Sequence, residues 1–181
     1  VDFQLVGGGE FSIYTTCIET IYGITFMVLA PDGKIVQDLM DRIENKEEVR
    51  AYIDETVKKS DMDRTELNKG KTGCRLEGVY AINPVNGKQV PVVIGDFVLA
   101  NYGTGAVMAV PSHDQRDFEY AVAHHIPMIQ VIDGRDVSEC AFEKQDYLGK
   151  GCRLCNSEEF TGLTVEEAKE AITCKLEKAG V

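Results

Sequence analysis

The chain has 181 residues, of which 44% are hydrophobic and 27% charged, and its formal net charge is -11. This length suits one domain over residues 1–181, and no apolar run approaches the roughly 18 to 20 residues that a membrane helix needs. The acidic charge argues against a broad nucleic-acid footprint, because such binding neutralises many phosphates, but it permits the gripping of a few terminal nucleotides. Residues 1–11 lack the basic region and apolar core of a signal peptide, so we expect a cytoplasmic protein with no membrane partner.

The six cysteines are scattered along the chain and are expected to be reduced thiols. Cys152 and Cys155 have the spacing of zinc ligands, but a structural zinc site usually needs a second pair, and none is evident. We therefore expect an ordinary surface turn at this pair and no metal site.

The first third of the chain predicts two strands followed by two helices. Residues 11–16 are aromatic and β-branched and residues 24–30 are continuously apolar, which favours strands joined by a short polar link at 17–20. Apolar side chains then recur at helical spacing in two groups, and the break at 44–46 indicates two helices rather than one. The charge-rich segment 60–71 is expected to be a short helix or loop on the surface. The two apolar groups are Leu39, Met40 and Ile43, and Val49, Tyr52, Ile53 and Val57.

A hairpin is predicted in the middle of the chain. Residues 74–82 and 89–94 have β composition and flank residues 83–87, in which the pair Asn86–Gly87 is a strong cue for a hairpin turn. Residues 106–110 predict a further buried strand, which Pro111 ends because it has no N–H to give to a ladder. With such a hairpin a purely parallel sheet is not expected, and the predicted fold class is mixed α/β.

Residues 101–120 carry a dense group of ionisable side chains where the predicted strand passes into a helix. Ser112 or His113 is expected to cap this helix. Junctions of this kind are where α/β proteins often build sites. The alternative is that Asp114 only caps the helix, while Arg116 and Asp117 form a solvated ion pair. The ionisable side chains are His113, Asp114, Arg116 and Asp117, and the apolar stripe of the helix is expected to comprise Phe118, Ala121, Val122 and His125.

The last third predicts a strand, a loop and a long helix. Residues 128–132 are apolar and predict another buried strand, whereas 133–157 has little periodicity and is expected to be loop with at most a short strand. Thr164 and Glu167 form a capping box that begins the last helix, and Gly180 can close it. The core stripe of this helix is expected to comprise Val165, Ala168, Ile172, Leu176 and Ala179.

The sequence excludes several common chemistries. It has no P-loop or dinucleotide loop, no G-x-S-x-G elbow and no H-E-x-x-H helix, and no cysteine is tied to a histidine. What remains is the ionisable group at the strand–helix junction and the hydroxyls of Thr15, Thr16 and Thr20. That set suits the binding of an ammonium group and the orienting of a water molecule. One interpretation is therefore a small-molecule binding domain that uses Asp117 for an amino group.

A family resemblance rests on three ordered blocks, Tyr14–Gly23, Gly78–Pro91 and Tyr102–Asp117, and extends through Lys59–Lys71 and Asn156–Thr164. Together these blocks resemble the editing insertion, connective polypeptide 1, of leucyl-tRNA synthetase of the bacterial or organellar type. The resemblance covers nearly the whole chain. Because the nucleotide-binding signatures of a synthetase catalytic core are absent, we expect a single editing domain excised from a longer chain.

The resemblance implies a synthetase editing-domain fold, with a central mixed or antiparallel sheet or barrel-like core and peripheral helices. It implies post-transfer editing in protein biosynthesis, in which water hydrolyses the ester of tRNA for leucine mischarged with isoleucine, norvaline, methionine or valine. A second site is needed because a hydrophobic pocket discriminates one methyl group by only about 1 to 3 kcal/mol. The implied partners are the 3′ end of this tRNA, noncognate amino acids and the rest of a class I leucine–tRNA ligase. No cofactor is implied for the domain, which is expected to be a monomer alone, whereas the parent enzyme uses ATP and Mg.

The resemblance also assigns roles to individual positions. Asp117 matches the acid that holds the substrate α-ammonium group, and Thr20 matches the threonine whose bulk keeps a leucyl side chain out. Thr15 and Thr16 match a threonine-rich segment that positions water or steadies an oxyanion, so they join Asp117 as the catalytic set. The remaining matched positions are Tyr102, Met108 and Val110, at the terminal adenosine and pocket wall, and Asp114, Arg116 and His113, as further substrate-binding and supporting residues.

One departure from the family pattern affects this interpretation. Cys17, Ile18 and Glu19 stand where the family usually has Arg-Pro-Asp. The change removes a fixed positive charge and a proline that restricts the backbone, although Glu19 keeps the acid. The alternative function is therefore an editing-impaired insertion that only binds or positions the tRNA acceptor end.

Overall fold

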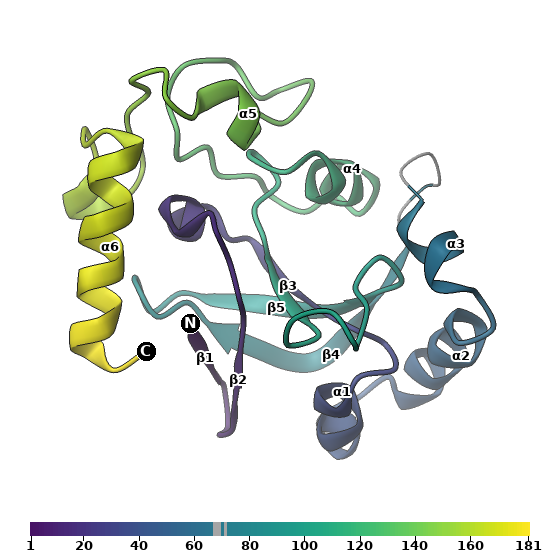
Figure 1. Cartoon of the computed structure of the whole chain (residues 1–181). Coiled ribbons are helices and arrows are strands. Elements are labelled where there is room, and N and C mark those ends of the chain that lie inside the picture. The colour runs from purple at the N-terminus through teal and green to yellow at the C-terminus, as the bar shows by residue number, and fades with distance from the viewer. Residues whose placement is uncertain (67–69, 71) are drawn as a thin grey trace. The chain divides into compact units, whose positions relative to one another are not determined.

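The computed structural model describes residues 1–66, 70 and 72–181 of the chain (Figure 1). These residues form two compact units. The first unit comprises residues 1–14, 26–82 and 88–108, and the second comprises residues 15–25, 83–87 and 109–181. Each unit is thus assembled from three separate stretches of sequence.

The first unit is built on a mixed six-stranded sheet. Its strands are β1 (Asp2–Leu5), β2 (Glu10–Ser12), β3 (Phe26–Leu29), β4 (Gly73–Ile82), β5 (Gln89–Gly95) and β6 (Ala106–Ala109). They are arranged in the order β2-β1-β4-β5-β3-β6 and the sheet is nearly closed, like a barrel. The pairs β1–β2, β1–β4 and β4–β5 are antiparallel, whereas β3 and β5 are parallel. The predicted mixed sheet and the predicted hairpin are therefore confirmed.

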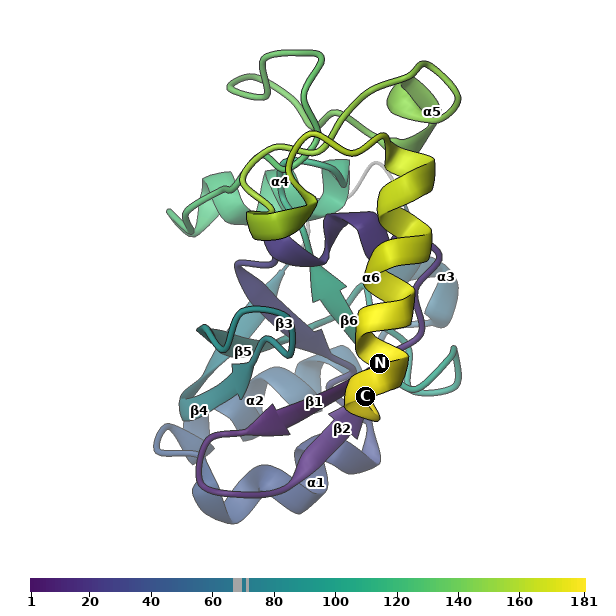
Figure 2. The same cartoon turned by 90° about the vertical axis from the view of Figure 1, so that its left-hand side faces the viewer.

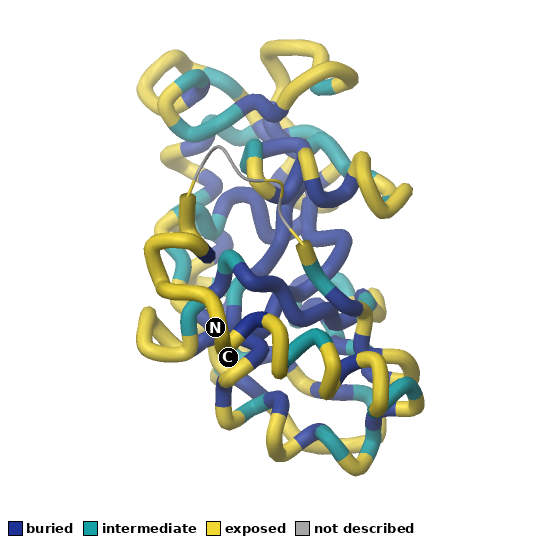
Figure 3. The backbone as a smooth tube through the Cα atoms, turned by 90° about the vertical axis from the view of Figure 1, so that its right-hand side faces the viewer, coloured by how far each residue is buried: buried dark blue, intermediate teal, exposed yellow. Residues whose placement is uncertain are grey.

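The local sequence explains the two central strands. All four residues of β3 are buried, as expected for a strand covered on both faces, and its parallel partner β5 is buried over its last four residues. The β4–β5 connection uses Gly87 at φ 69, a left-handed conformation that favours glycine. Buried backbone is dark blue in Figure 3. Residues 19–31 are all buried, which places the end of the threonine-rich segment and β3 in the interior of their respective units.

The helices of the first unit lie in the region of the two predicted apolar groups. They are α1 (Lys34–Leu39), the short 3-10 helix η2 (Met40–Arg42), α2 (Lys46–Thr56) and α3 (Asp61–Thr65). The first group, however, spans the end of α1 and η2, and Ile43 follows η2. Helices α1 and α2 lie on the same side of the sheet, and α2 packs against β4 (Figure 2). Val57, predicted on the apolar stripe, is 53% exposed because α2 ends one residue earlier. The short helix expected within 60–71 is α3, while residues 67–69 and 71 of that segment and of the family resemblance lie outside the described residues.

The second unit is mainly helical. Its elements are η1 (Ile18–Gly23), α4 (Gln115–Ala123), α5 (Lys144–Tyr147), η3 (Glu158–Phe160) and α6 (Val165–Ala179). The capping box of Thr164 and Glu167 begins α6, and Gly180 at φ 73 closes it, as predicted. Four of the five predicted stripe residues are buried, and helix α6 packs against η1 and η3. The fifth, Ala179, is exposed at the last turn.

Several predictions of local structure are wrong, most of them in the second unit. Residues 128–132 make only an isolated bridge, Ile132 to Leu154, instead of a strand. The reason is that the N–H groups of Val131 and Ile132 donate to the His113 ring and so are not available to a ladder. The predicted strand at 11–16 ends at Ser12, and the polar link after it is the 3-10 helix η1. The predicted loop 133–157 contains the one-turn helix α5, and Val122 and His125 are exposed rather than part of an apolar stripe.

Candidate functional site

The junction between β6 and α4 is organised by Asp114. Its Oδ1 accepts hydrogen bonds from the backbone N–H groups of Arg116, at 2.9 Å, and Asp117, at 3.2 Å. Asp114 is therefore the N-cap of α4, and the prediction of Ser112 or His113 as the cap is wrong because both are buried in the preceding turn. The Arg116 guanidinium pairs with Asp114 at 3.2 Å and its side chain is 56% exposed, so this ion pair contributes little stability.

Asp117 differs from both neighbours because its carboxylate is buried, with only 6% of the residue exposed. Its Oδ2 accepts the N–H of Val110 at 2.9 Å, and no hydrogen bond to Oδ1 is found among the described residues. Burial raises the pKa of Asp117 well above its usual range, and the negative charge of Asp114 raises it further. The interpretation of Asp117 as one half of a solvated ion pair is therefore wrong. A buried carboxylate with one uncommitted oxygen favours a cationic ligand.

His113 is a cross-link inside the second unit. Its Nδ1 donates to the carbonyl oxygen of Phe142 at 3.0 Å, and its Nε2 accepts the N–H groups of Val131 and Ile132 at 3.0 and 3.2 Å. This pattern requires the neutral ring, and burial lowers the pKa of His113 to about 4. Both ring nitrogens are thus committed to the backbone, which gives this predicted substrate-binding residue a structural position.

The threonine-rich segment makes a tight local turn in the second unit. Thr15 Oγ1 accepts the N–H of Cys17 at 3.0 Å, and the Thr20 hydroxyl donates to the carbonyl oxygen of Cys17 at 2.8 Å. Thr20 is buried and Thr16 is exposed. The hydroxyls of the two outer threonines therefore fix the backbone around Cys17, while the Thr16 side chain faces solvent.

Tyr147 connects this segment to the turn that precedes α4. Its hydroxyl donates to Glu19 Oε1 at 2.9 Å, and its ring meets the His113 ring edge-on with centroids 6.1 Å apart. Burial and then the Glu19 charge raise the pKa of Tyr147, so the phenol stays protonated as a donor. The second unit thus brings η1 and the Asp117 junction to one network. Tyr147 was not predicted from the sequence, because no local sequence pattern indicates a contact with Glu19, which lies 128 positions away.

The other predicted site residues are divided between the units. Tyr102 and Met108 belong to the first unit, where Tyr102 is 81% exposed in the turn before β6 and Met108 is 9% exposed within β6. Val110 belongs to the second unit, where it is 7% exposed and binds Asp117 through its N–H.

All six cysteines are unpaired thiols. Among the described residues, no group of three or more His, Cys, Asp or Glu side chains is arranged to hold a metal ion. In the same part of the chain, no helix is both long and apolar enough to cross a bilayer.

Comparison with solved structures places the fold among the aminoacyl-tRNA synthetases. The fold is similar to part of the crystal structure of the ternary complex of Agrobacterium radiobacter K84 agnB2 LeuRS-tRNA-LeuAMS, with a TM-score of 0.72 and 25% sequence identity. The match covers 99% of this chain and 18% of that chain. The family model of the leucyl-tRNA synthetase editing domain matches residues 1–177. The chain belongs to this family.

Curated relatives agree with the family. The chain is 42% identical over 181 residues to the leucine–tRNA ligase of Alkaliphilus oremlandii, covering 100% of this chain and 22% of that relative. It is 45% identical over 169 residues to the leucine–tRNA ligase of Clostridium tetani, covering 93% of this chain and 20% of the relative. It is 46% identical over 168 residues to that of Clostridium botulinum, covering 93% and 19%. The chain therefore spans about a fifth of the length of these relatives.

Proposed function

We propose that this chain is the editing domain of a longer leucine–tRNA ligase and that it hydrolyses the ester of tRNA for leucine carrying a wrong amino acid. The observation that carries the proposal is the buried Asp117 carboxylate, which has one oxygen on the Val110 N–H and the other without a hydrogen bond in the described part of the chain. An aminoacyl ester presents an α-ammonium group, which is the cation that such a carboxylate would bind. Family membership over residues 1–177 supports the same activity.

The proposed substrates are esters of isoleucine, norvaline, methionine and valine. The ammonium group of the substrate ionises Asp117, whose pKa burial has raised, and a hydrogen bond to a charged partner contributes about 1.5 to 3 kcal/mol. Thr20 excludes the leucyl side chain by its bulk. Thr15 and Thr16 position the attacking water, so that orientation rather than covalent catalysis supplies most of the rate.

The tRNA partner is proposed to enter by its 3′ end. In the second unit, Val110 lies at the pocket wall and Arg116, whose side chain is 56% exposed, reaches the tRNA end. For Tyr102 and Met108 of the first unit, the family resemblance implies a role in binding the terminal adenosine. Asp114 supports the site by capping α4. Because the net charge is -11, the domain alone has little affinity for RNA, and the rest of a cytoplasmic synthetase delivers the acceptor end.

The experiment that tests the proposal follows the loss of ester from isoleucyl-tRNA for leucine in the parent synthetase. Asp117→Ala is expected to slow this loss by about 100-fold or more, because the ammonium anchor is removed. Glu119→Ala, which removes an exposed acid from the same helix, is the matched control and is expected to keep the wild-type rate. Wild-type loss no faster than that of Asp117→Ala, or than spontaneous hydrolysis, would reject deacylation.

The second candidate is an insertion that binds the acceptor end without clearing errors. The replacement of Arg-Pro-Asp by Cys17, Ile18 and Glu19 favours it. The same experiment separates the two candidates when tRNA binding is measured in parallel. Unchanged tRNA binding together with no ester loss would identify the second.

A further inference from the structure

A network of charged and polar side chains lies beside the threonine-rich segment of the second unit. The Lys169 ammonium donates to the Thr16 carbonyl oxygen at 3.4 Å and lies 3.6 Å from Glu19 Oε2. The Lys144 ammonium donates to the Thr16 hydroxyl at 3.3 Å. Two lysines, from α5 and α6, thus converge on one threonine, and one of them also faces a carboxylate.

Burial of the Glu19 carboxylate is the part of this network that is unfavourable for the free energy of folding. Glu19 is 0% exposed, its Oε1 accepts from the Tyr147 hydroxyl, and its Oε2 has no hydrogen bond in the described part of the chain. Leaving an ionised carboxylate buried and unpaired is strongly unfavourable. The nearby Lys169 ammonium, whose side chain is 27% exposed, supplies the compensating charge.

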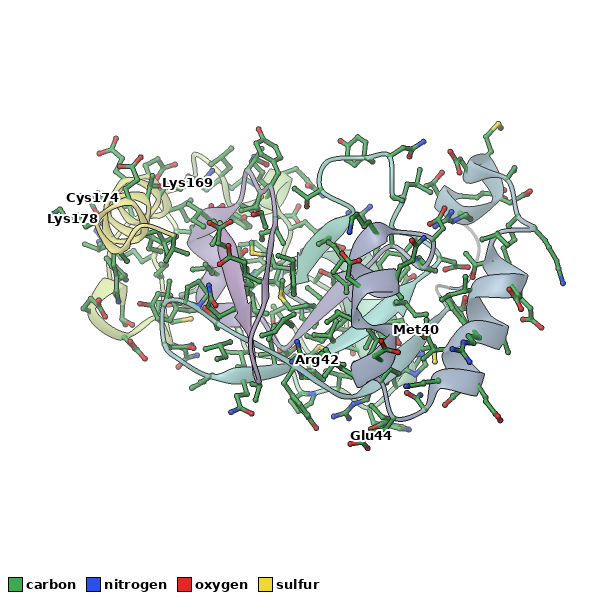
Figure 4. The ribbon with its side chains drawn as sticks, turned by 90° about the horizontal axis from the view of Figure 1, so that it is seen from below. Met40, Arg42, Glu44, Lys169, Cys174 and Lys178 are labelled. Atoms are coloured by element: carbon green, nitrogen blue, oxygen red, sulfur yellow. The ribbon has the colours of Figure 1, made fainter. Side chains whose placement is uncertain are left out.

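Lys169 belongs to the well-packed helix α6. It projects from α6, as do Cys174 and Lys178 (Figure 4). This helix has a capping box at its start, a left-handed glycine at its end and a buried stripe that includes Ala168 beside Lys169. The position of the ammonium group is therefore set by a packed helix rather than by a loop.

We propose that Lys169 is a positioning residue of the deacylation site: one ammonium group fixes the Thr15–Thr20 segment through both the Thr16 carbonyl oxygen and the Glu19 carboxylate. The catalytic part of this inference rests on the proposed function. Lys144 also contacts Thr16, but it makes no ion pair among the described residues. The proposed positioning of the Thr15–Thr20 segment therefore depends on the charge of Lys169 and not on that of Lys144. The role is distinct from contact with the substrate, because the ammonium acts through the segment that carries the threonines.

The kinetic test uses Lys169→Met, Lys169→Arg and Lys178→Met in the parent synthetase with isoleucyl-tRNA for leucine. Lys169→Met is expected to lower kcat by about tenfold while KM changes by less than about twofold, because the segment is misplaced but substrate contacts remain. Lys169→Arg restores the charge and is expected to recover most of kcat. Lys178→Met, an exposed lysine of the same helix, keeps the wild-type values. A wild-type kcat in Lys169→Met would overturn the proposal.

Two readouts test the inference independently of activity. In spectra with labelled threonine methyl groups, Lys169→Met is expected to shift the Thr16 and Thr20 signals, and Lys178→Met to leave them in place. The double variant Glu19→Gln/Lys169→Met is expected to melt at a higher temperature than Lys169→Met, because the uncompensated carboxylate is gone. Unmoved methyl signals, or no recovery in the double variant, would reject the role of Lys169. If the wild type does not deacylate, the proposed function fails while these two readouts still decide the inference.

Discussion

His113 and Asp117 are both buried in the second unit, and burial moves their pKa values in opposite directions. The neutral form is favoured in each case, which keeps the histidine uncharged and makes the aspartate reluctant to ionise without a cation. The two buried side chains differ in how many of their polar atoms form hydrogen bonds. Both ring nitrogens of His113 are hydrogen-bonded, to three backbone groups in all, whereas only one carboxylate oxygen of Asp117 is hydrogen-bonded among the described residues. The other Asp117 oxygen can therefore bind a ligand.

The buried neutral His113 predicts a loss of stability in mild acid. Its pKa is about 4 in the folded chain and about 6.5 when unfolded, so the unfolded state binds more protons between these values. The contribution to stability is complete above about pH 6.5 and is lost as the pH falls toward 4, by about 3 kcal/mol in total. Urea denaturation at several pH values measures this slope.

His113→Gln is expected to flatten that slope while lowering stability at pH 7, because the amide cannot titrate and does not match all three partners. A variant with both His124→Gln and His125→Gln is the matched control, since both side chains are exposed. A slope that survives in His113→Gln, or that disappears in the control, contradicts the assignment.

The size of Thr20 predicts the specificity of the site. Thr20→Ala is expected to let the parent synthetase hydrolyse correctly charged leucyl-tRNA, because the bulk that excludes leucine is lost. Thr20→Val is the matched control: both variants lose the hydroxyl that donates to Cys17, but valine keeps the branch. Release of leucine by Ala and not by Val is the expected result. Intact leucyl-tRNA with the Ala variant would refute the assignment.

At the scale of elements, the five-residue helix α3 shows how a short element is held. Its Arg64 is 4% exposed and donates to the carbonyl oxygens of Asp96, at 2.9 Å, and Val98, at 2.8 Å. The same guanidinium binds both oxygens of Asp32 at 3.2 Å. A planar fork with five donors can serve these partners together, which an ammonium group cannot.

Arg64→Lys is therefore expected to lower the free energy of unfolding by about 2 to 4 kcal/mol, since buried acceptors lose their donors. Arg50→Lys, on the exposed face of α2, is the matched control and is expected to change it by less than about 0.5 kcal/mol. Chemical denaturation of both variants measures the difference. Equal values for the two would show that the Arg64 contacts do not hold α3.

The elements that the sequence predicted correctly carry their signals within a few residues. The β4–β5 hairpin has Asn86–Gly87 at its turn, and α6 has its capping box and its closing glycine. The error at 128–132 arose because the N–H groups of Val131 and Ile132 donate to the His113 side chain, 18 and 19 residues earlier in the chain. An apolar run predicts burial, but it does not indicate where its backbone hydrogen bonds go.

In the candidate site, too, features set by neighbouring residues were predicted from the sequence, whereas contacts between distant residues were not. The alternative that Asp114 caps a helix needed only its spacing to the following residues, and it is confirmed. The burial of Asp117 and the contact between Glu19 and Tyr147 required the fold, since the latter two residues are 128 positions apart. No periodicity or spacing rule reaches across such a separation.

At the scale of the whole molecule, neither unit is a continuous piece of chain. All helices of the second unit except η1 lie in residues 109–181, but residues 15–25, which contain η1, and residues 83–87 also belong to it. Within residues 15–25, Glu19 and Ile21 are 0% exposed and Tyr22 is 3% exposed, so the segment is part of the interior of the unit.

A fragment of residues 109–181 is therefore expected not to fold alone, because its apolar surface lacks the segment that covers it. A two-dimensional amide spectrum of the fragment should show narrow dispersion, whereas the full chain should show wide dispersion. Adding a synthetic peptide of residues 15–25 is expected to produce at least some dispersed signals. A well-dispersed spectrum of the fragment alone would mean that the interior forms without residues 15–25.

The link between Lys169 and Thr16 also sets an order of events during synthesis on the ribosome. The two residues are 153 positions apart, so at about 5 to 20 residues per second the threonine leaves the ribosome roughly 8 to 30 seconds before its lysine partner is made. Until then the Glu19 carboxylate lacks the Lys169 ammonium group that it faces in the folded chain. The threonine-rich turn is thus translated well before α6 but makes its contact with Lys169 only after α6 has emerged, so this part of the candidate site assembles late.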